Sequence, residues 1–322
     1  YTGLWEVRDW MQASTPDVMP RSLCPSSMPS STGAASPSIS PGLDNAVHIV
    51  ALQTSTSTVG HWEIKNGTVT YIGVVPNVST STPAAIGLEG VVSGQTQMLG
   101  MAYRDKATGA LKYTRWSGTS WSTPVNVLNV TTAAAPAMSS QVGLIAYVGA
   151  NNVVSATAYS ANSTGGFIAP QAMPAGSPAA DGTKRLSIVA EPSNGAAYVG
   201  YRTTADEFVW ALGSWSSCYP TTGSYWCASY PKLSTDWVGA ALSYGSGQRV
   251  NLLVTRREKS TDATPSLENW VVDGSGLYPW GQNRMQLSGQ PGYAQNSLDS
   301  WVAGESGTGL VIGKTDNCFA NL

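Results

Sequence analysis

The feature that most constrains this chain is a weak repeat that runs along its whole length. The clearest copy holds the runs 86–92, 98–105 and 110–116, followed by 120–124. Runs of this kind, bounded by Gly, Asn, Ser and Pro, are typical of short strands joined by turns. A repeat of roughly 40–50 residues with several strands is typical of a β-propeller blade. The second run of each copy begins near Val47, Met98, Gly143, Ala196, Val250 and Gly309.

Other runs fit the same plan and predict an all-β ring of six four-stranded blades. Seven blades would follow if two units are merged between Arg185 and Arg249, and an irregular β-sandwich is the alternative fold. We expect three runs to be innermost strands, namely Arg185–Ala190, Trp237–Tyr244 and Leu298–Gly304. We expect three others to be third strands, namely His61–Ile64, Phe208–Leu212 and Trp270–Val272.

The two ends of the chain complement each other. Leu310–Lys314 begins a unit that the sequence leaves unfinished, and Thr2–Trp10 resembles the run Thr108–Trp116 of the second copy. We therefore expect strands from both ends to share the last blade and to close the ring, which removes a free sheet edge. Residues 1–322 would then form a single β-propeller domain.

The composition excludes several classes of function. Only 11% of the residues are charged and the net charge is −2, so no long-range field attracts nucleic acid or an anionic membrane. No apolar stretch is long enough for membrane insertion. No zinc spacing, phosphate loop or dinucleotide fingerprint occurs, so we expect no metal and no cofactor. Of the two histidines, His48 lies in an apolar run and is expected to be a structural strand residue.

Several signals favour a secreted glycoprotein. The sequence begins at Tyr1 rather than Met, as after removal of a signal segment. If the chain ends share a blade, Cys24–Cys318 is the disulfide that locks the closure, and Cys218–Cys227 staples a short loop. The alternative is four free, buried thiols. Four sequons predict glycosylation at Asn66, Asn77, Asn129 and Asn162.

Carboxylates are the candidates for catalysis. Asp44, Glu89, Glu191 and Glu305 are expected on or beside innermost strands, with Asp236 and Asp299 at the starts of two others. Acids that converge at the central channel could cleave glycosidic bonds. An enzyme of this kind, a glycoside hydrolase or a polysaccharide lyase, would use Glu89, Glu191 and Glu305. We favour the other interpretation, in which these acids bind backbone amides, pair with arginine, or hold waters or a cation in the channel.

The aromatic residues favour sugar binding. The chain has 12 Trp and 14 Tyr but 3 Phe, and Trp and Tyr combine a flat apolar face with a hydrogen-bonding tip. A packing residue repeated in each blade would give the same pattern. Arginine recurs near the ends of second strands, where a guanidinium can donate to vicinal hydroxyls, at Arg104, Arg202 and Arg256.

The second copy resembles a repeat of the six-bladed fungal fucose-binding lectins, through Tyr103-Arg104-Asp105, Gly109-Ala110-Leu111, Trp116-Ser117-Gly118 and Trp121. The resemblance implies sites between blades that combine an Arg, a Glu on the following strand and an aromatic residue from a neighbouring blade. In the second copy Tyr113 holds the place of this Glu. Carried over by position, the site residues are Arg104, Arg202, Arg256, Glu6, Glu63, Glu268, Trp121, Trp215 and Trp280.

Together these patterns predict a secreted lectin that binds glycans or glycoproteins at repeated sites without transforming them. The alternatives are the propeller enzyme described above and a propeller that binds protein without a sugar site. The sequence leaves the oligomeric state open, a homo-oligomer included.

Overall fold

In a computed structural model of the chain, the strands form six four-stranded antiparallel sheets. The structure describes residues 24–43, 46–66, 68–89, 97–139, 142–190 and 197–213. In the last third of the chain it describes the strand residues 232–233, 237–244, 250–256, 266–273, 276–286, 292–295, 300–306 and 309–314. Six blades are therefore confirmed. We number the blades 1 to 6 in the order in which their innermost strands follow one another along the chain.

The first three blades follow one another along the chain. Blade 1 consists of β2 (Ala34–Pro41), β3 (Val47–Gln53), β4 (Thr58–Lys65) and β5 (Thr68–Val74). Blade 2 consists of β6 (Ala85–Leu88), β7 (Leu99–Arg104), β8 (Ala110–Trp116) and β9 (Val125–Thr131). Blade 3 consists of β10 (Ala137–Met138), β11 (Leu144–Val148), β12 (Val154–Ala158) and β13 (Gln171–Ala172), with 3-10 turns at Ala150–Asn152 and Thr164–Gly166.

The other three blades complete the ring. Blade 4 consists of β14 (Ser187–Ala190), β15 (Ala197–Arg202), β16 (Phe208–Gly213) and β17 (Lys232–Leu233). Blade 5 consists of β18 (Trp237–Tyr244), β19 (Val250–Arg256), β20 (Ser266–Asp273) and β21 (Gly276–Gln286). Blade 6 consists of β22 (Gly292–Gln295), β23 (Ser300–Ser306), β24 (Gly309–Lys314) and β1 (Cys24–Ser27).

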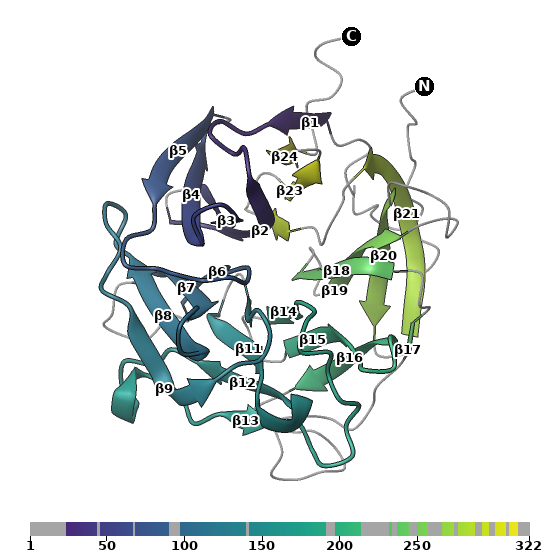
Figure 1. Cartoon of the computed structure of the whole chain (residues 1–322). Coiled ribbons are helices and arrows are strands. Elements are labelled where there is room, and N and C mark those ends of the chain that lie inside the picture. Colours follow the sequence, from purple (N-terminus) through teal and green to yellow (C-terminus); the bar gives the residue numbers. More distant parts are fainter. Residues whose placement is uncertain are drawn as a thin grey trace.

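The sheets stand around a common centre, with the first strand of each blade innermost (Figure 1). These first strands contact one another in an unbroken cycle that runs from β2 through β6, β10, β14, β18 and β22 back to β2. Within the described part of the chain, no helix has the length and hydrophobicity needed to cross a membrane.

Blade 6 is built from both ends of the described chain, which confirms the predicted closure. Its N-terminal strand is β1, and Ser26 pairs with Ile312 of β24. In this blade the predicted strand positions were wrong, because each run lies one strand further from the centre than expected. Leu298–Gly304 falls largely on β23, the second strand rather than the innermost, and the run from Gly309 is the third strand. The place expected for Thr2–Trp10 is therefore taken by β24, and Thr2–Trp10 itself lies outside the described residues.

The predicted register is confirmed in blades 1 to 5. The second strands begin within one residue of the expected positions, and the three predicted third strands fall on β4, β16 and β20. Arg104, Arg202 and Arg256 are each the last residue of a second strand, as the repeat predicted.

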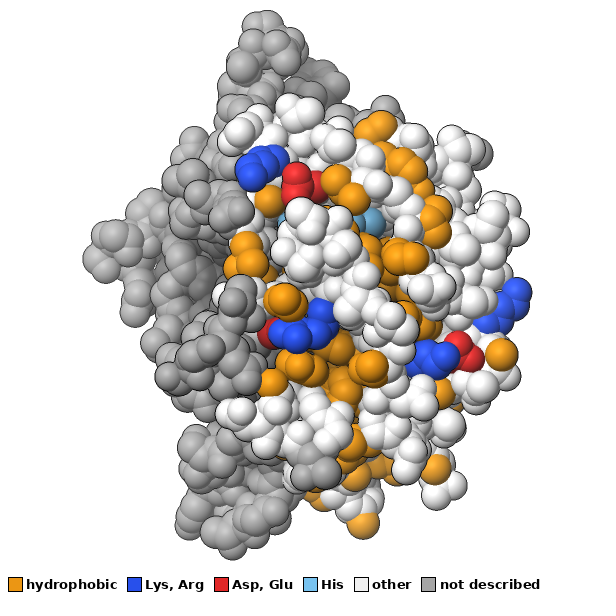
Figure 2. Space-filling model, turned by 90° about the vertical axis from the view of Figure 1, so that its left-hand side faces the viewer, with side chains coloured by type: hydrophobic (Ala, Val, Ile, Leu, Met, Phe, Trp, Pro, Cys, Tyr) orange, Lys and Arg blue, Asp and Glu red, His pale blue; other side chains and the backbone are white. Residues whose placement is uncertain are grey.

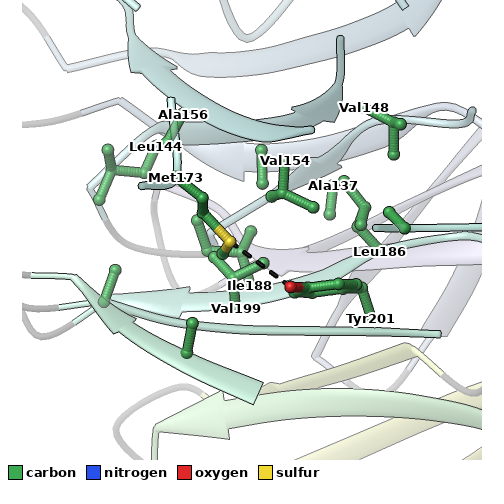
Figure 3. Packing of buried hydrophobic residues seen from close by; sticks show 14 of the residues in the cluster. Ala137, Leu144, Val148, Val154, Ala156, Met173, Leu186, Ile188, Val199 and Tyr201 are labelled. Atoms are coloured by element: carbon green, nitrogen blue, oxygen red, sulfur yellow. Dashed lines mark hydrogen bonds between the residues drawn. The ribbon is translucent and has the colours of Figure 1, made fainter. Parts of the chain in front are cut away.

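Each hydrophobic cluster of the core lies between two neighbouring blades rather than inside one sheet. The cluster between blades 3 and 4 joins Leu144, Val154 and Met173 to Ile188 and Tyr201 (Figure 3). The hydroxyl of Tyr201 lies 3.6 Å from the Met173 sulfur and donates to the carbonyl of Pro178. Because a sheet has two faces, each blade is stabilised by burial against both of its neighbours.

The closing blade offers a direct test of this packing. Ile312 of β24 is buried in the cluster between blades 6 and 1, whereas Ile72 of β5 is 40% exposed. We expect Ile312→Ala to lower the free energy of unfolding by about 2–5 kcal/mol. The matched Ile72→Ala should change it by less than about 0.5 kcal/mol. Urea denaturation compares the two, and equal effects would contradict the closure.

Candidate functional site

Two neighbouring interfaces between blades share one arrangement of side chains. In blade 2 an isolated bridge joins Trp116 to Trp121 after the third strand, and in blade 3 an equivalent bridge joins Tyr159 to Phe167. A threonine anchors each turn, since Thr114 donates to the carbonyl of Ser122 and Thr157 to that of Ile168, both at 2.6 Å. Each aromatic pair lies against side chains on the third strand of the preceding blade.

At the interface between blades 1 and 2, the aromatic pair contacts His61, which in turn contacts His48. His61 of β4 contacts both tryptophans edge-to-face, with its ring centroid 4.9 Å from Trp116 and 5.2 Å from Trp121. His61 Nε2 lies 3.0 Å from Nδ1 of His48 on β3. Glu63 Oε2 lies 3.8 Å from His48 Nε2, and the Glu63 side chain is 27% exposed.

Both imidazoles are held neutral by burial. Desolvation lowers the pKa of His48 to about 4, assisted by the charge of Lys65. Desolvation and the proximity of His48 lower the pKa of His61 to about 3. His48 lies on β3, as predicted for a structural strand residue, and it also belongs to the polar network between the blades.

At the interface between blades 2 and 3, the same arrangement holds an arginine and a glutamate. Arg115 of β8 binds Glu89 through Nε to Oε1 at 2.6 Å and through Nη2 to Oε2 at 2.7 Å. The Tyr113 hydroxyl donates to Oε1 at 2.7 Å. Arg115 Cζ lies 4.5 Å from the ring centroid of Tyr159, a cation–π distance. This interface therefore combines a guanidinium, a carboxylate and an aromatic face.

The protonation states at this second interface are fixed. Burial, the charge of Glu89 and its hydrogen bond raise the pKa of Tyr113 well above 10. Burial alone would lower the pKa of Arg115, but the hydrogen bonds and charge of Glu89 outweigh this effect and raise it. The Arg115 side chain remains 26% exposed while that of Glu89 is 4% exposed, so Arg115 is the more accessible member of the pair.

At each of these two interfaces a glycine leaves space for a polar side chain. Gly42 and Glu89 follow the first strands of their blades in the same register, and a Cβ on Gly42 would collide with the ring of His48. Gly100 occupies the place of His48 in blade 2, and a Cβ there would collide with the Tyr113 hydroxyl. In blade 1 the glycine after the first strand leaves room for His48 of the second strand, and in blade 2 the glycine of the second strand leaves room for Tyr113 of the third strand, whose hydroxyl binds Glu89.

The interface between blades 3 and 4 lacks this polar pair. When blades 2 and 3 are aligned on Thr114 and Thr157, Ala156 takes the position of Tyr113 and Ala158 that of Arg115. Both alanines belong to the apolar cluster between blades 3 and 4 (Figure 3). The arrangement is therefore not repeated at every interface that the structure describes.

Some predicted site residues lie apart. In the β7–β8 hairpin Arg104 pairs with Leu111, whereas Leu99 pairs with Trp116, so Arg104 and Trp121 lie at opposite ends. Arg104 Nε donates to the carbonyl of Thr132 at 2.8 Å. Arg202 forms an ion pair with Asp206, with Nε 2.9 Å from Oδ1. These two arginines therefore hold the ends of hairpins.

Other predicted residues are brought together. Glu63 and Trp121 meet at the interface between blades 1 and 2, joined through His48 and His61. Arg256, Glu268 and Trp280 lie on strands of blade 5, but the description does not extend to their side chains. Outside the described residues lie Glu6, Trp215, Asp44, Glu191, Asp236, Asp299 and the partner cysteines Cys218, Cys227 and Cys318.

The carboxylates predicted at the central channel do not all lie on or beside innermost strands. Glu89 follows the innermost strand β6, as predicted, and both of its oxygens accept hydrogen bonds from Arg115. Glu305 lies on β23, a second strand, so its expected place on or beside an innermost strand was wrong. The described residues contain no group of three or more His, Cys, Asp or Glu that could hold a metal ion.

Sequence reasoning missed Arg115, His61 and Tyr159. The signal for Arg115 was its spacing of two from Tyr113 on a third strand, which places both side chains on one face. The sequence gives no such signal for Tyr159, because only the fold shows that this residue of the next blade faces Tyr113 and Arg115.

The outer surface of these blades is sparsely charged. On the side of the ring seen in Figure 2, hydrophobic side chains are scattered over the surface, and the few charged side chains, blue and red, occur in small groups. All four asparagines of the sequons are exposed, and each lies in or beside an outer turn or outer strand of blades 1 to 3.

Comparison with known proteins supports the fold. No family model and no curated protein matches the sequence. Among solved structures, the lectin of Aleuria aurantia, described as a six-bladed β-propeller with a novel fucose recognition mode, has a TM-score of 0.59 at 12% identity over 89% of this chain and 93% of its own. SapL1 lectin in complex with α-methyl fucoside has a TM-score of 0.56 at 15% identity, covering 88% and 96%. An α-L-arabinanase of Penicillium chrysogenum complexed with arabinobiose has a TM-score of 0.57 at 11% identity, covering 90% and 96%.

The histidine pair predicts a loss of stability in acid. An unfolded histidine binds its proton near pH 6.5, whereas the folded pKa values are about 4 and about 3. The unfolded state therefore binds more protons as the pH falls below 6.5, and the folded state loses up to about 1.4 kcal/mol per pH unit for each histidine. Urea denaturation between pH 7 and pH 4.5 measures this slope. The variant with both His48→Gln and His61→Asn should show a shallower slope, and an unchanged slope would contradict the account.

A second prediction concerns the close approach at Gly100. We expect Gly100→Ala to displace the Tyr113 hydroxyl from Glu89 and to lower the free energy of unfolding by about 1–3 kcal/mol. Gly149 is the matched control, because a Cβ there would meet its nearest neighbours at 3.6 Å, an ordinary contact. Thermal unfolding of the two variants makes the comparison. A Gly100→Ala protein as stable as the Gly149→Ala protein would argue against the packing described.

Proposed function

We propose that this protein is a secreted carbohydrate-binding protein, a lectin, whose glycan sites lie at the interfaces between blades. The observation that carries the proposal is the arrangement found at two neighbouring interfaces, where the aromatic pair of one blade lies against polar side chains from the third strand of the preceding blade. Aromatic faces suit the C–H faces of sugars, and charged or amide groups suit their hydroxyls.

The interface between blades 2 and 3 supports the proposal most directly. Glu89 uses Nε and Nη2 of Arg115, so Nη1 is left to donate to the hydroxyls of a ligand beside the half-buried ring of Tyr159. Because Glu89 neutralises the guanidinium, this pair is suited to a neutral sugar rather than to an isolated anion. Ordered groups of this kind cost little reorganisation on binding.

The interface between blades 1 and 2 offers Trp121 and Glu63 as the corresponding groups. Trp121 is half-buried, and its ring is oriented by His61. Single sites of this size bind weakly, so two or more on one ring would gain strength on a glycoprotein surface through multivalency. The fold likeness to solved lectins, two of which carry fucose in their descriptions, supports this choice.

Secretion, glycosylation of the four sequons and the disulfides Cys24–Cys318 and Cys218–Cys227 belong to the same proposal. The exposure of Asn66, Asn77, Asn129 and Asn162 is compatible with glycan attachment. An arabinanase shares this fold. Of the predicted catalytic carboxylates, Glu89 is the one whose side chain the structure describes, and both of its oxygens accept hydrogen bonds from Arg115, which does not favour catalysis at this residue.

The test is binding to a glycan array, followed by calorimetry with the best ligand. We expect Trp121→Ala and Tyr159→Ala each to remove one site or to weaken it about tenfold, which corresponds to about 1.4 kcal/mol. The matched control is Tyr71→Ala, because Tyr71 packs on Trp62 outside both interfaces. Unchanged binding in both site variants, or release of reducing or unsaturated sugar from the glycans, would contradict the proposal.

A further inference from the structure

We infer that His61 and His48 are positioning residues that hold the indole of Trp121 in place only while both imidazoles are neutral, so that acid releases this aromatic face. The inference rests on the proposed function in one respect, namely that Trp121 contacts the sugar. The relay of hydrogen bonds itself depends only on the described residues.

The direction of the hydrogen bonds follows from the chemistry of the indole. Trp Nε1–H can only donate, and it lies 3.3 Å from His61 Nδ1, so that nitrogen must accept. A neutral imidazole then carries its proton on Nε2, which donates to His48 Nδ1 at 3.0 Å. His48 therefore carries its proton on Nε2, which points toward Glu63 at 3.8 Å. One tautomer of each ring satisfies the whole chain of contacts.

Protonation breaks this relay at a defined point. A proton on His61 Nδ1 would place two donors face to face, and the indole would lose its acceptor. A proton on His48 Nδ1 would oppose the donor on His61 Nε2 in the same way. Both imidazoles are buried, so water does not replace the lost acceptor without movement of a side chain.

The surroundings contain few groups that could compensate. Of the described titratable residues facing this pair, Glu63 and Lys65 come from β4, and Tyr103 of β7 lies in the same interface. From the turn of blade 2 the pair meets Trp116 and Trp121, which do not titrate. A carboxylate such as that of Glu63, 3.8 Å from His48 Nε2, favours the charged imidazole. Burial and the charge of Lys65 favour the neutral form, and they lower the pKa of His48 to about 4.

The neighbouring interface provides an internal control. Tyr113 holds the position of His61 there, and Arg115 holds that of Glu63. Tyr113 and Arg115 both keep their protons between pH 7 and pH 4. Acid should therefore release Trp121 while the aromatic ring of Tyr159 stays over Arg115.

The first experiment reads the relay without any sugar. Proton–nitrogen NMR of the isotope-labelled full chain should show His61 protonated on Nε2 and not on Nδ1 at pH 7. The indole signal of Trp121, identified by its loss in Trp121→Phe, should shift with a midpoint near pH 4. In His61→Asn, whose amide oxygen replaces the acceptor, that signal should stay in place through the same pH range.

A space-filling variant separates positioning from packing. His61→Leu keeps a side chain of similar size without an acceptor, so the indole signal should already be displaced at pH 7. If His61→Leu and His61→Asn both behave like the wild type, or if the signal shifts equally in wild type and His61→Asn, the inference is wrong. Far-UV circular dichroism on each sample shows whether the strands persist over the range.

The second experiment measures glycan binding by calorimetry. The wild type should lose one site between pH 7 and pH 4 and keep the site at blades 2 and 3, whereas His61→Asn should keep both. Equal loss of both sites would overturn the inference while leaving the lectin proposal intact. If no glycan binds at any pH, the proposed function fails, and the NMR titration still decides whether the imidazoles position Trp121.

Discussion

Burial of each sheet against its two neighbours is the constraint on which this structure depends. A single four-stranded blade cannot bury its two apolar faces alone, and each described hydrophobic cluster joins two blades. The ring therefore needs a complete sixth blade, which the chain provides by pairing β1 with β24. The same requirement forces every blade to present side chains to the next one, and the candidate sites arise where those side chains are polar.

Two neighbouring interfaces of the same backbone arrangement carry different polar side chains, a histidine pair in one and an arginine–glutamate pair in the other. In blade 1 the second strand supplies His48, whose ring fills the space beside Gly42. In blade 2 Glu89 follows the first strand, and the Tyr113 hydroxyl that binds it fills the space beside Gly100. A buried carboxylate is stable only with a partner, which Arg115 provides, and a buried imidazole is stable when neutral. Both interfaces contain a half-buried aromatic ring from the following blade, Trp121 in one and Tyr159 in the other.

The fold was accessible from the sequence because it depends on alternation and turns. Apolar runs such as Val47–Gln53 and the recurring arginines gave the register of five blades. The last blade was shifted by one strand, because the run 309–314 resembles a second strand and only pairing with Ser26 shows that it is the third. The sites were less accessible, since Trp121 and Glu63 could be singled out but their neighbours come from another blade. Arg104 illustrates this limit, because its chemistry suits a sugar but the hydrogen bond from its Nε to the carbonyl of Thr132 could not be predicted from the sequence.

The central claim is that glycans bind between blades, against rings supplied by the following blade. A crystal structure of the protein with the glycan that binds it best tests this claim most directly. The account predicts sugar beside Tyr159 and Arg115, with a second molecule beside Trp121 at neutral pH. Sugar bound only in the central channel, with both interfaces empty, would contradict it.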